Sequence, residues 1–258
     1  MSDKSSDKQA KIVIDDVRKS FVSAGGDEVP VISGVSLSVA DSEFVAIVGP
    51  SGCGKSTLMN LIAGFERPDS GEVRIDGKPV RGPSPKGIVI SQHGSVFPWL
   101  TVQQNLMFGL TGAEHGEKHA ERAALADHYA AVVGLKGFEG SYPHELSGGM
   151  LKRVEIARAL VVKPEILYMD EPFSALDALM NLHMRNELLR ILEEERHTVL
   201  LITHDVEEAI YMADRIMVLS PRPTTIKAAF AVDMPHPRKL SSPQAQQLRE
   251  DILKALGL

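Results

Sequence analysis

The sequence predicts an α/β fold with a mostly parallel core sheet, and three observations support this prediction. Residues 44–48, 166–169 and 199–203 form short, continuously apolar runs, which are typical of strands buried on both faces. Each run precedes a stretch with helical periodicity, and strands that alternate with helices form parallel sheets. The run at 44–48 also leads directly into a glycine-rich loop, which gives the order strand, loop, helix.

The other elements are expected around these strands. Val35, Leu37 and Val39 alternate with serine, as in a half-exposed strand. Asp76 and Gly77 stand between apolar residues and predict a hairpin turn. We expect further strands at 12–17 and 215–220, helices at 114–133, 147–162, 178–195 and 204–213, and a last helix capped by Ser242 with Pro243 at its first position.

The chain divides into three expected parts. Residues 1–10 are mostly serine, aspartate and lysine, which is typical of a disordered tail. Residues 11–240 are expected to form one domain, in which a helical stretch at about 95–160 interrupts the alternation and forms a separate lobe. Residues 241–258 are expected to contain the C-terminal helix.

Composition excludes several classes of protein. The 258 residues carry 28 basic and 34 acidic side chains, a net charge of −6, so we expect no nucleic-acid partner. One cysteine excludes an internal disulfide and a cysteine-rich metal site. Apolar runs fall short of the ~20 residues that span a bilayer, and the polar N-terminus is unlike a secretory signal. We therefore expect a cytosolic chain whose membrane role, if it has one, goes through a partner.

The sequence GPSGCGKST at 49–57 fits the phosphate-loop pattern G-x-x-x-x-G-K-[ST]. Glycines let the backbone wrap around phosphate oxygens, and the N-terminus of the following helix adds partial positive charge. Lys55 is expected to reach the β and γ phosphates of ATP, Ser56 to ligate Mg²⁺ and Thr57 to donate to the α phosphate. The predicted cradle consists of Gly49, Pro50, Ser51, Gly52, Cys53, Gly54, Lys55, Ser56 and Thr57, with Cys53 as a loop filler.

Two acids end the apolar run at 166–169. Asp170 is placed to hold Mg²⁺ through water, and Glu171 to orient or deprotonate a water that attacks the γ phosphate. The alternative is a solvated strand end, where acids are common. The phosphate loop in the same chain favours the catalytic interpretation, because a triphosphate with Mg²⁺ needs a carboxylate opposite the loop.

The stretch HELSGGMLKRVEIARAL at 144–160 resembles the signature motif of ABC-type ATPases. Other motifs of this family occur in the expected order: Gln92 in VISQ matches the glutamine loop, SALD at 174–177 the D-loop, and His204 in LITHD the switch histidine. Phe21 in VRKSF stands where the family has an aromatic that stacks on adenine. The resemblance covers about residues 12–240 and implies a P-loop NTPase fold with an antiparallel β subdomain and a helical lobe.

The resemblance also implies roles for single residues. Gln92 is expected to contact Mg²⁺ and assist catalysis, and His204 to contact the γ phosphate and hold the attacking water. Phe21 stacks on adenine or is otherwise a core aromatic. Asp177 supports a dimer interface, caps the helix from 178, or does both.

The signature supplies a second phosphate-binding helix end. Ser147 would cap the helix and present the N–H groups of Gly148 and Gly149. One chain cannot readily bring both helix ends to one nucleotide, since they lie on different lobes. The family's solution is a head-to-tail homodimer in which ATP lies between the phosphate loop of one copy and LSGG of the other.

The segment PWLTV, with residues 222–238, resembles the nitrate/sulfonate/taurine group of importer ATPases. This resemblance implies integral membrane permease subunits as partners, a solute-binding protein as an indirect one, and a place at the cytoplasmic face of the cell membrane. Phe97, Pro98 and Trp99 would form an exposed anchor for a permease helix, or Trp99 belongs to the core of the helical lobe.

The sequence also departs from the family pattern. His93 and Gly94 follow Gln92 where an acidic residue is common, and Met150 and Lys152 stand where glutamine is frequent. The leading hypothesis is an ATPase that dimerises and drives a separate permease. The alternatives are a soluble ABC-type ATPase with another role and a regulatory module that binds nucleotide without turnover.

Overall fold

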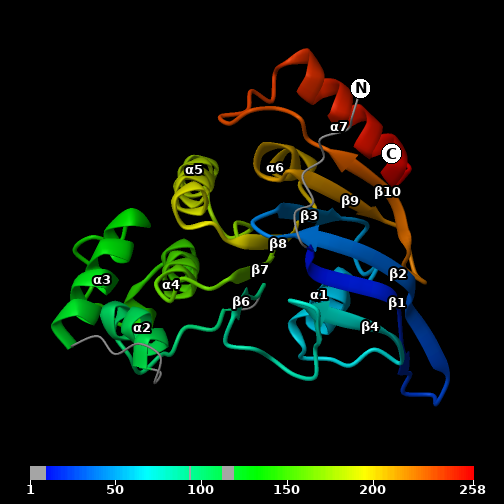
Figure 1. Cartoon of the computed structure of the whole chain (residues 1–258). Helices are drawn as coiled ribbons and strands as arrows, with labels where there is room; N and C mark the ends of the chain where they lie inside the picture. The colour runs from blue at the N-terminus through cyan, green and yellow to red at the C-terminus, as the bar shows by residue number, and fades with distance from the viewer. Residues whose placement is uncertain (1–9, 93, 112–118) are drawn as a thin grey trace. The chain divides into compact units, whose positions relative to one another are not determined.

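The computed structural model describes residues 10–92, 94–111 and 119–258, so the expected tail lies almost entirely outside the described residues. The described chain forms two compact units. The first contains residues up to 87 and from 198 to 258, and the second contains residues 88–197. Figure 1 shows the course of the chain through both units.

An antiparallel sheet with the order β2-β1-β4-β5 belongs to the first unit. Its strands are β1 (Ala10–Val22), β2 (Glu28–Ala40), β4 (Ser70–Ile75) and β5 (Lys78–Pro79). Asp76 and Gly77 join β4 to β5 with φ angles of 50° and 71°. Two consecutive positive φ angles are the geometry of a type I′ turn, so the predicted hairpin is confirmed.

The second sheet of the first unit is mixed. Strand β3 (Phe44–Val48) lies between β8 (Thr198–Ile202) and β9 (Arg215–Leu219) and runs parallel to both. Strand β10 (Ile226–Ala231) pairs with β9 in the antiparallel sense. The sequence analysis missed β10, whose residues alternate between half-buried and exposed positions, as at a sheet edge.

Helices cover both faces of this mixed sheet. Figure 1 shows α6 (Val206–Met212) and α7 (Pro243–Leu256) on one side of β3 and β9, and α1 (Lys55–Ala63) on the other. Arg238, which is buried, donates to the carbonyl oxygens of Ile210 and Ala213 at the end of α6. The parallel strands with helices on both faces are the α/β fold that the apolar runs predict.

The second unit is mainly helical. Its elements are β6 (Gly87–Ile90), α2 (Val102–Phe108), the 3₁₀ turns Gly109–Thr111 and Pro143–Glu145, α3 (His119–Val132), α4 (Gly148–Leu160), β7 (Ile166–Asp170) and α5 (Ala178–Glu195). Helices α2, α3 and α4 pack against one another, and β6 and β7 are hydrogen-bonded neighbours. Strand β6 is another element that the sequence analysis missed.

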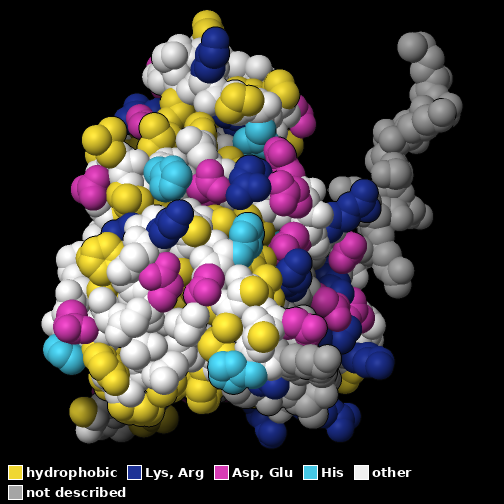
Figure 2. Space-filling model, turned by 90° about the vertical axis from the view of Figure 1, so that its left-hand side faces the viewer, with side chains coloured by type: hydrophobic (Ala, Val, Ile, Leu, Met, Phe, Trp, Pro, Cys, Tyr) yellow, Lys and Arg dark blue, Asp and Glu magenta, His cyan; other side chains and the backbone are white. Residues whose placement is uncertain are grey.

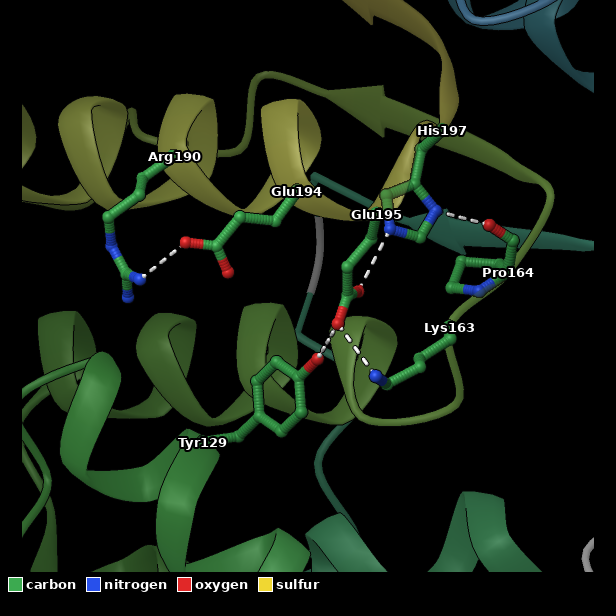
Figure 3. A network of polar contacts seen from close by, with 7 residues as sticks. All are labelled: Tyr129, Lys163, Pro164, Arg190, Glu194, Glu195 and His197. Carbon is green, nitrogen blue, oxygen red and sulfur yellow. Dashed lines mark hydrogen bonds and ion pairs between the residues drawn. The ribbon is translucent and has the colours of Figure 1, made fainter.

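A network of polar contacts surrounds the C-terminal end of α5 in the second unit (Figure 3). Glu195, the last residue of α5, accepts hydrogen bonds from Tyr129 Oη at 3.0 Å and Lys163 Nζ at 2.9 Å. His197 Nε2 lies 3.1 Å from the same carboxylate, and its Nδ1 contacts the Pro164 carbonyl oxygen. The network therefore ties α3, α5 and the loop after α4 together.

The network changes the pKa of two of its members. Burial by itself would raise the pKa of Glu195, but hydrogen bonds from Lys163, His197 and Tyr129 outweigh it and lower the pKa overall. Burial, together with the negative charge of Glu195, raises the pKa of Tyr129. Glu195 is thus held as a carboxylate and Tyr129 as a neutral donor.

The surface of the chain is mixed in character. On the face drawn in Figure 2, basic and acidic side chains are interspersed, with apolar side chains scattered among them. Within the part of the chain that the structure describes, none of the helices combines the length and the apolar character that a membrane span requires.

Glu195→Gln should lower the free energy of unfolding at neutral pH, because the amide replaces a carboxylate that accepts three contacts. The folded pKa of Glu195 is lowered, so the stabilisation is present above its ordinary value and is lost as the pH falls below about 4.5. Urea unfolding of both proteins between pH 7 and pH 3.5 should therefore show a difference that shrinks in acid. Glu194→Gln, on the same helix, is the control, and a difference independent of pH would contradict the assignment.

Candidate functional site

The glycine-rich loop connects the end of β3 to the first residue of α1. Gly52 and Gly54 have φ angles of 72° and 119°, in the region that favours glycine. Lys55 is 8% exposed, and its Nζ donates to the carbonyl oxygens of Gly49 at 2.8 Å and Pro50 at 3.0 Å. The Lys55 ammonium group is therefore hydrogen-bonded to the first residues of the glycine-rich loop.

Gly54 is the most constrained position of the loop. A Cβ atom there would lie 2.8 Å from Val31 Cγ1 and 3.2 Å from Ile32 Cδ1, both on β2. Thr224, fully buried, donates its hydroxyl to the Cys53 carbonyl oxygen and its backbone N–H to Val31 at 2.8 Å. Sequence analysis had no signal for Thr224, because it contacts the loop only through the tertiary fold.

Helix α1 differs from other helices of the chain in having no side-chain cap. Side-chain oxygens cap α2, α4, α5, α6 and α7 through Thr101, Ser147, Asp177, Asp205 and Ser242. The first N–H groups of a helix need a partner, and an anion supplies one that suits the helix dipole. The loop, the uncapped helix and the Lys55 ammonium together fit the phosphates of a nucleotide.

Side-chain oxygens for Mg²⁺ are present in both units. Ser56 is exposed in the first turn of α1, and Asp170 ends the buried strand β7. Hydroxyl and carboxylate oxygens are the protein ligands that Mg²⁺ prefers, usually with several waters retained. The donor types of Ser56 and Asp170 thus fit the ion.

His204 lies at the same edge of the mixed sheet as the loop. Ile47 of β3 pairs with Ile202 of the parallel strand β8. Gly49 comes two residues after Ile47, and His204 comes two residues after Ile202, so both lie just beyond the carboxyl ends of neighbouring strands. The carboxyl ends of neighbouring parallel strands meet at one edge, which is where ligands bind in open α/β sheets. His204 is exposed there, between β8 and the capping residue of α6.

Phe21 lies near the end of β1, opposite Val29 of β2. Its side chain is 40% exposed, and Lys19 Nζ lies 5.4 Å from the ring centroid. The core interpretation of Phe21 is therefore wrong. The ring keeps a surface on which a planar group can stack, and its role in adenine binding stays a prediction.

Gln92 and Glu171 meet in the second unit. Gln92 Nε2 donates to Glu171 Oε2 at 3.4 Å. Glu171 follows Asp170 and has a φ of 49°, a strained conformation for a residue with a side chain. Strain of this kind persists where the surrounding structure imposes it, and it gathers at functional positions.

The signature and the D-loop lie against each other. Ser147 caps α4, as expected, by accepting from the N–H of Met150 at 3.3 Å. A Cβ on Gly149 would lie 3.5 Å from the Ala175 carbonyl oxygen. Asp177 caps α5 by accepting from the backbone N–H of residue 180 at 3.0 Å, so the capping role is confirmed and the interface role stays a prediction.

Phe97 and Trp99, which precede α2, form an aromatic cluster with Phe108, its last residue. Trp99 is 70% exposed, so it does not belong to the core of the helical lobe. The Phe97 ring packs between it and Phe108, with centroid distances of 5.6 and 4.5 Å. The alternative of an exposed apolar anchor is the one that the structure favours.

Lys152 and Glu155 of α4 are buried side chains, and the sequence analysis assigned no role to this pair. Their Nζ and Oε2 atoms lie 3.1 Å apart. Opposite charges three residues apart on a helix are the signal that could have indicated this pair. Their burial could not have been predicted, since it depends on residues about sixty positions earlier.

Comparison with known proteins identifies relatives over nearly the whole chain. A sequence model of the ABC transporter family matches residues 32–174. A putative ATP-binding protein of Brucella abortus is 48% identical over 225 residues, which make up 86% of each chain. A bicarbonate transport ATP-binding protein of Synechocystis sp. is 40% identical and a nitrate import ATP-binding protein of Synechococcus elongatus 38% identical. Each of these two aligns with 95% of this chain, which spans 38% of its relative's length.

Solved structures share the same fold. The dimeric structure of a bacterial ABC transporter cassette has a TM-score of 0.77 at 30% identity, covering 86% of this chain and 99% of that one. A dimeric post-hydrolysis state of the same cassette, bound to ADP and Pi, has a TM-score of 0.76 at 30% identity, with the same coverage.

Gly54→Ala should weaken nucleotide binding by at least about tenfold, because the new methyl group meets β2 and the backbone leaves its preferred region. Titration with a fluorescent ATP analogue measures this effect. The matched control is Gly26→Ala, where φ is 91° but nothing lies within 4 Å of the added atom. Equal affinities of the wild type and Gly54→Ala would contradict the importance of this close approach.

Proposed function

The chain belongs to the ABC transporter family and carries its ATPase domain, and we propose that it is the ATP-hydrolysing subunit that energises a separate membrane permease. The observation that carries this proposal is the uncapped α1 behind a glycine loop, with the buried Lys55 at its start. Nucleotide binding at this loop is the first part of the proposal, and hydrolysis, dimerisation and coupling to a permease are its further parts.

In the proposed binding mode, the first turn of α1 and Lys55 bind the phosphates of ATP. The Ser56 hydroxyl and Gln92, and the Asp170 carboxylate through water, would hold Mg²⁺. Bound Mg²⁺ would neutralise part of the charge that develops on the phosphate oxygens. Phe21 stacks on the adenine ring.

Glu171 acts as the general base of hydrolysis. Its carboxylate takes a proton from the water that attacks the γ phosphorus, and the Gln92 amide, 3.4 Å away, fixes its orientation. His204 contacts the γ phosphate and holds the same water. A base placed by a strained backbone and a hydrogen bond needs little reorganisation during the reaction.

We propose that two copies assemble head to tail around ATP. The loop of one copy and the N-terminus of α4, with Ser147, Gly148 and Gly149, would enclose one nucleotide. Support comes from the dimeric structure of the related cassette. Asp177, beside the signature, would lie in this interface.

We propose that the partner at the membrane is a permease that imports a small oxyanion. Two relatives are named for nitrate import and bicarbonate transport, and the PWLTV segment resembles the nitrate/sulfonate/taurine group. The exposed Trp99 provides an apolar contact for the permease. The chain would then work at the cytoplasmic face of the membrane, with a solute-binding protein as an indirect partner.

Glu171→Gln should lower the ATPase kcat by roughly a hundredfold or more while ATP still binds, because the amide cannot accept the proton. With ATP and Mg²⁺ the variant should elute as a dimer from size exclusion, since slow hydrolysis leaves the nucleotide in place. Lys55→Ala is the control that should lose both binding and dimer.

Two results would contradict the proposal. A wild type without turnover in its purified permease complex would favour the regulatory alternative. A monomeric Glu171→Gln protein at saturating ATP would remove the support for the head-to-tail dimer.

A further inference from the structure

Helix α4 holds the segment around Gln92 with three charged side chains. Lys152, Glu155 and Arg158 are spaced three residues apart and therefore share one face of the helix. This face meets the chain at residues 91 and 95. The helix whose first turn carries the signature glycines thus also holds the glutamine loop.

Lys152 and Glu155 anchor the backbone on both sides of Gln92. Lys152 Nζ donates to the Ser91 carbonyl oxygen at 2.5 Å and lies 3.1 Å from Glu155 Oε2. Glu155 Oε1 accepts the backbone N–H of Ser95. One anchor precedes Gln92 directly, and the other follows it by three residues.

Arg158 continues the same contact surface. Its Nη1 donates to the Ser95 carbonyl oxygen at 2.8 Å and its Nη2 to the Ser95 hydroxyl at 2.6 Å. The guanidinium carbon lies 5.0 Å from the centroid of the Phe97 ring, a cation–π distance. The segment therefore ends in the aromatic cluster that includes the exposed Trp99.

The burial of the pair needs an explanation beyond stability. Lys152 is 5% exposed and Glu155 3% exposed. Removing two charges from water is costly, and a well-packed apolar pair is often as stable or more stable. An apolar pair, however, cannot donate to Ser91 or accept from Ser95. Both contacts fix the backbone that carries the Gln92 side chain to Glu171.

We propose that Lys152 and Glu155 are positioning residues of the ATPase, which set the Gln92 amide against Glu171 by anchoring the chain on both sides of it. The inference rests on the proposed function, because it concerns the same hydrolytic site. It adds that the geometry of hydrolysis depends on a charge pair inside α4 that touches neither nucleotide nor metal.

The test is the double variant Lys152→Met/Glu155→Met, which removes both charges and keeps side chains of similar volume. We expect an unfolding midpoint at or above that of the wild type. The kcat for ATP should fall by about tenfold or more, because a small displacement of a catalytic group has large effects. The KM should stay within about twofold, since the phosphate loop is unchanged.

Two further variants separate positioning from packing. Lys152→Arg keeps a buried cation that can donate to the Ser91 carbonyl, and it should retain more of the wild-type kcat than the double variant. Arg190→Met/Glu187→Met is the matched control, because it removes another pair three residues apart on a helix, with a 3.0 Å contact, whose side chains are 49% and 26% exposed. This control should leave kcat unchanged.

Hydrogen–deuterium exchange gives a readout that does not require turnover. In the double variant Lys152→Met/Glu155→Met, peptides that span 91–97 should exchange faster than in the wild type. The reason is that the backbone N–H of Ser95 has lost the Glu155 carboxylate as its acceptor. Peptides from the middle of α4 should be unchanged.

The outcomes distinguish the inference from the function on which it rests. A wild-type kcat in the stable double variant, or unchanged exchange over 91–97, overturns the positioning role while the ATPase assignment stands. A wild type without turnover in its permease complex overturns the proposed function and the positioning role with it.

Discussion

The close approach of the phosphate loop to β2 is the constraint on which the site depends. A Cβ atom added at Gly54 would lie 2.8 Å from Val31 Cγ1 and 3.2 Å from Ile32 Cδ1, and the φ of 119° there favours glycine. This geometry starts α1 without a side-chain cap and leaves its first turn to an anion. Thr224, from a distant part of the chain, stabilises the loop through the Cys53 carbonyl oxygen.

The two glycine-rich helix starts of the chain are built differently. Helix α1 relies on loop backbone and Lys55, whereas α4 is capped by Ser147 and has its second glycine packed on the D-loop. The first arrangement suits tight binding of several phosphate oxygens. The second is a preformed surface that offers the remaining N–H groups of a capped helix. In the proposed dimer, one nucleotide joins the two.

Charges inside α4 link this second surface to the glutamine loop and to the aromatic cluster at Phe97. The helix carries the signature at its first turn, the Lys152–Glu155 pair in its middle and Arg158 beside Phe97 near its end. Helix α4 thus contacts both the glutamine loop and the aromatic cluster that includes the exposed Trp99.

The sequence by itself determined the elements whose signals are local. Continuous apolar runs specified β3, β7 and β8, capping residues specified the starts of α4, α5 and α7, and the loop pattern specified the turn between β3 and α1. Tertiary structure alone decided the pairing of β10, the exposure of Phe21 and Trp99 and the burial of Lys152 and Glu155. The physical reason is that burial and strand pairing depend on neighbours far away in the chain, whereas caps, turns and periodicity depend on residues a few positions apart.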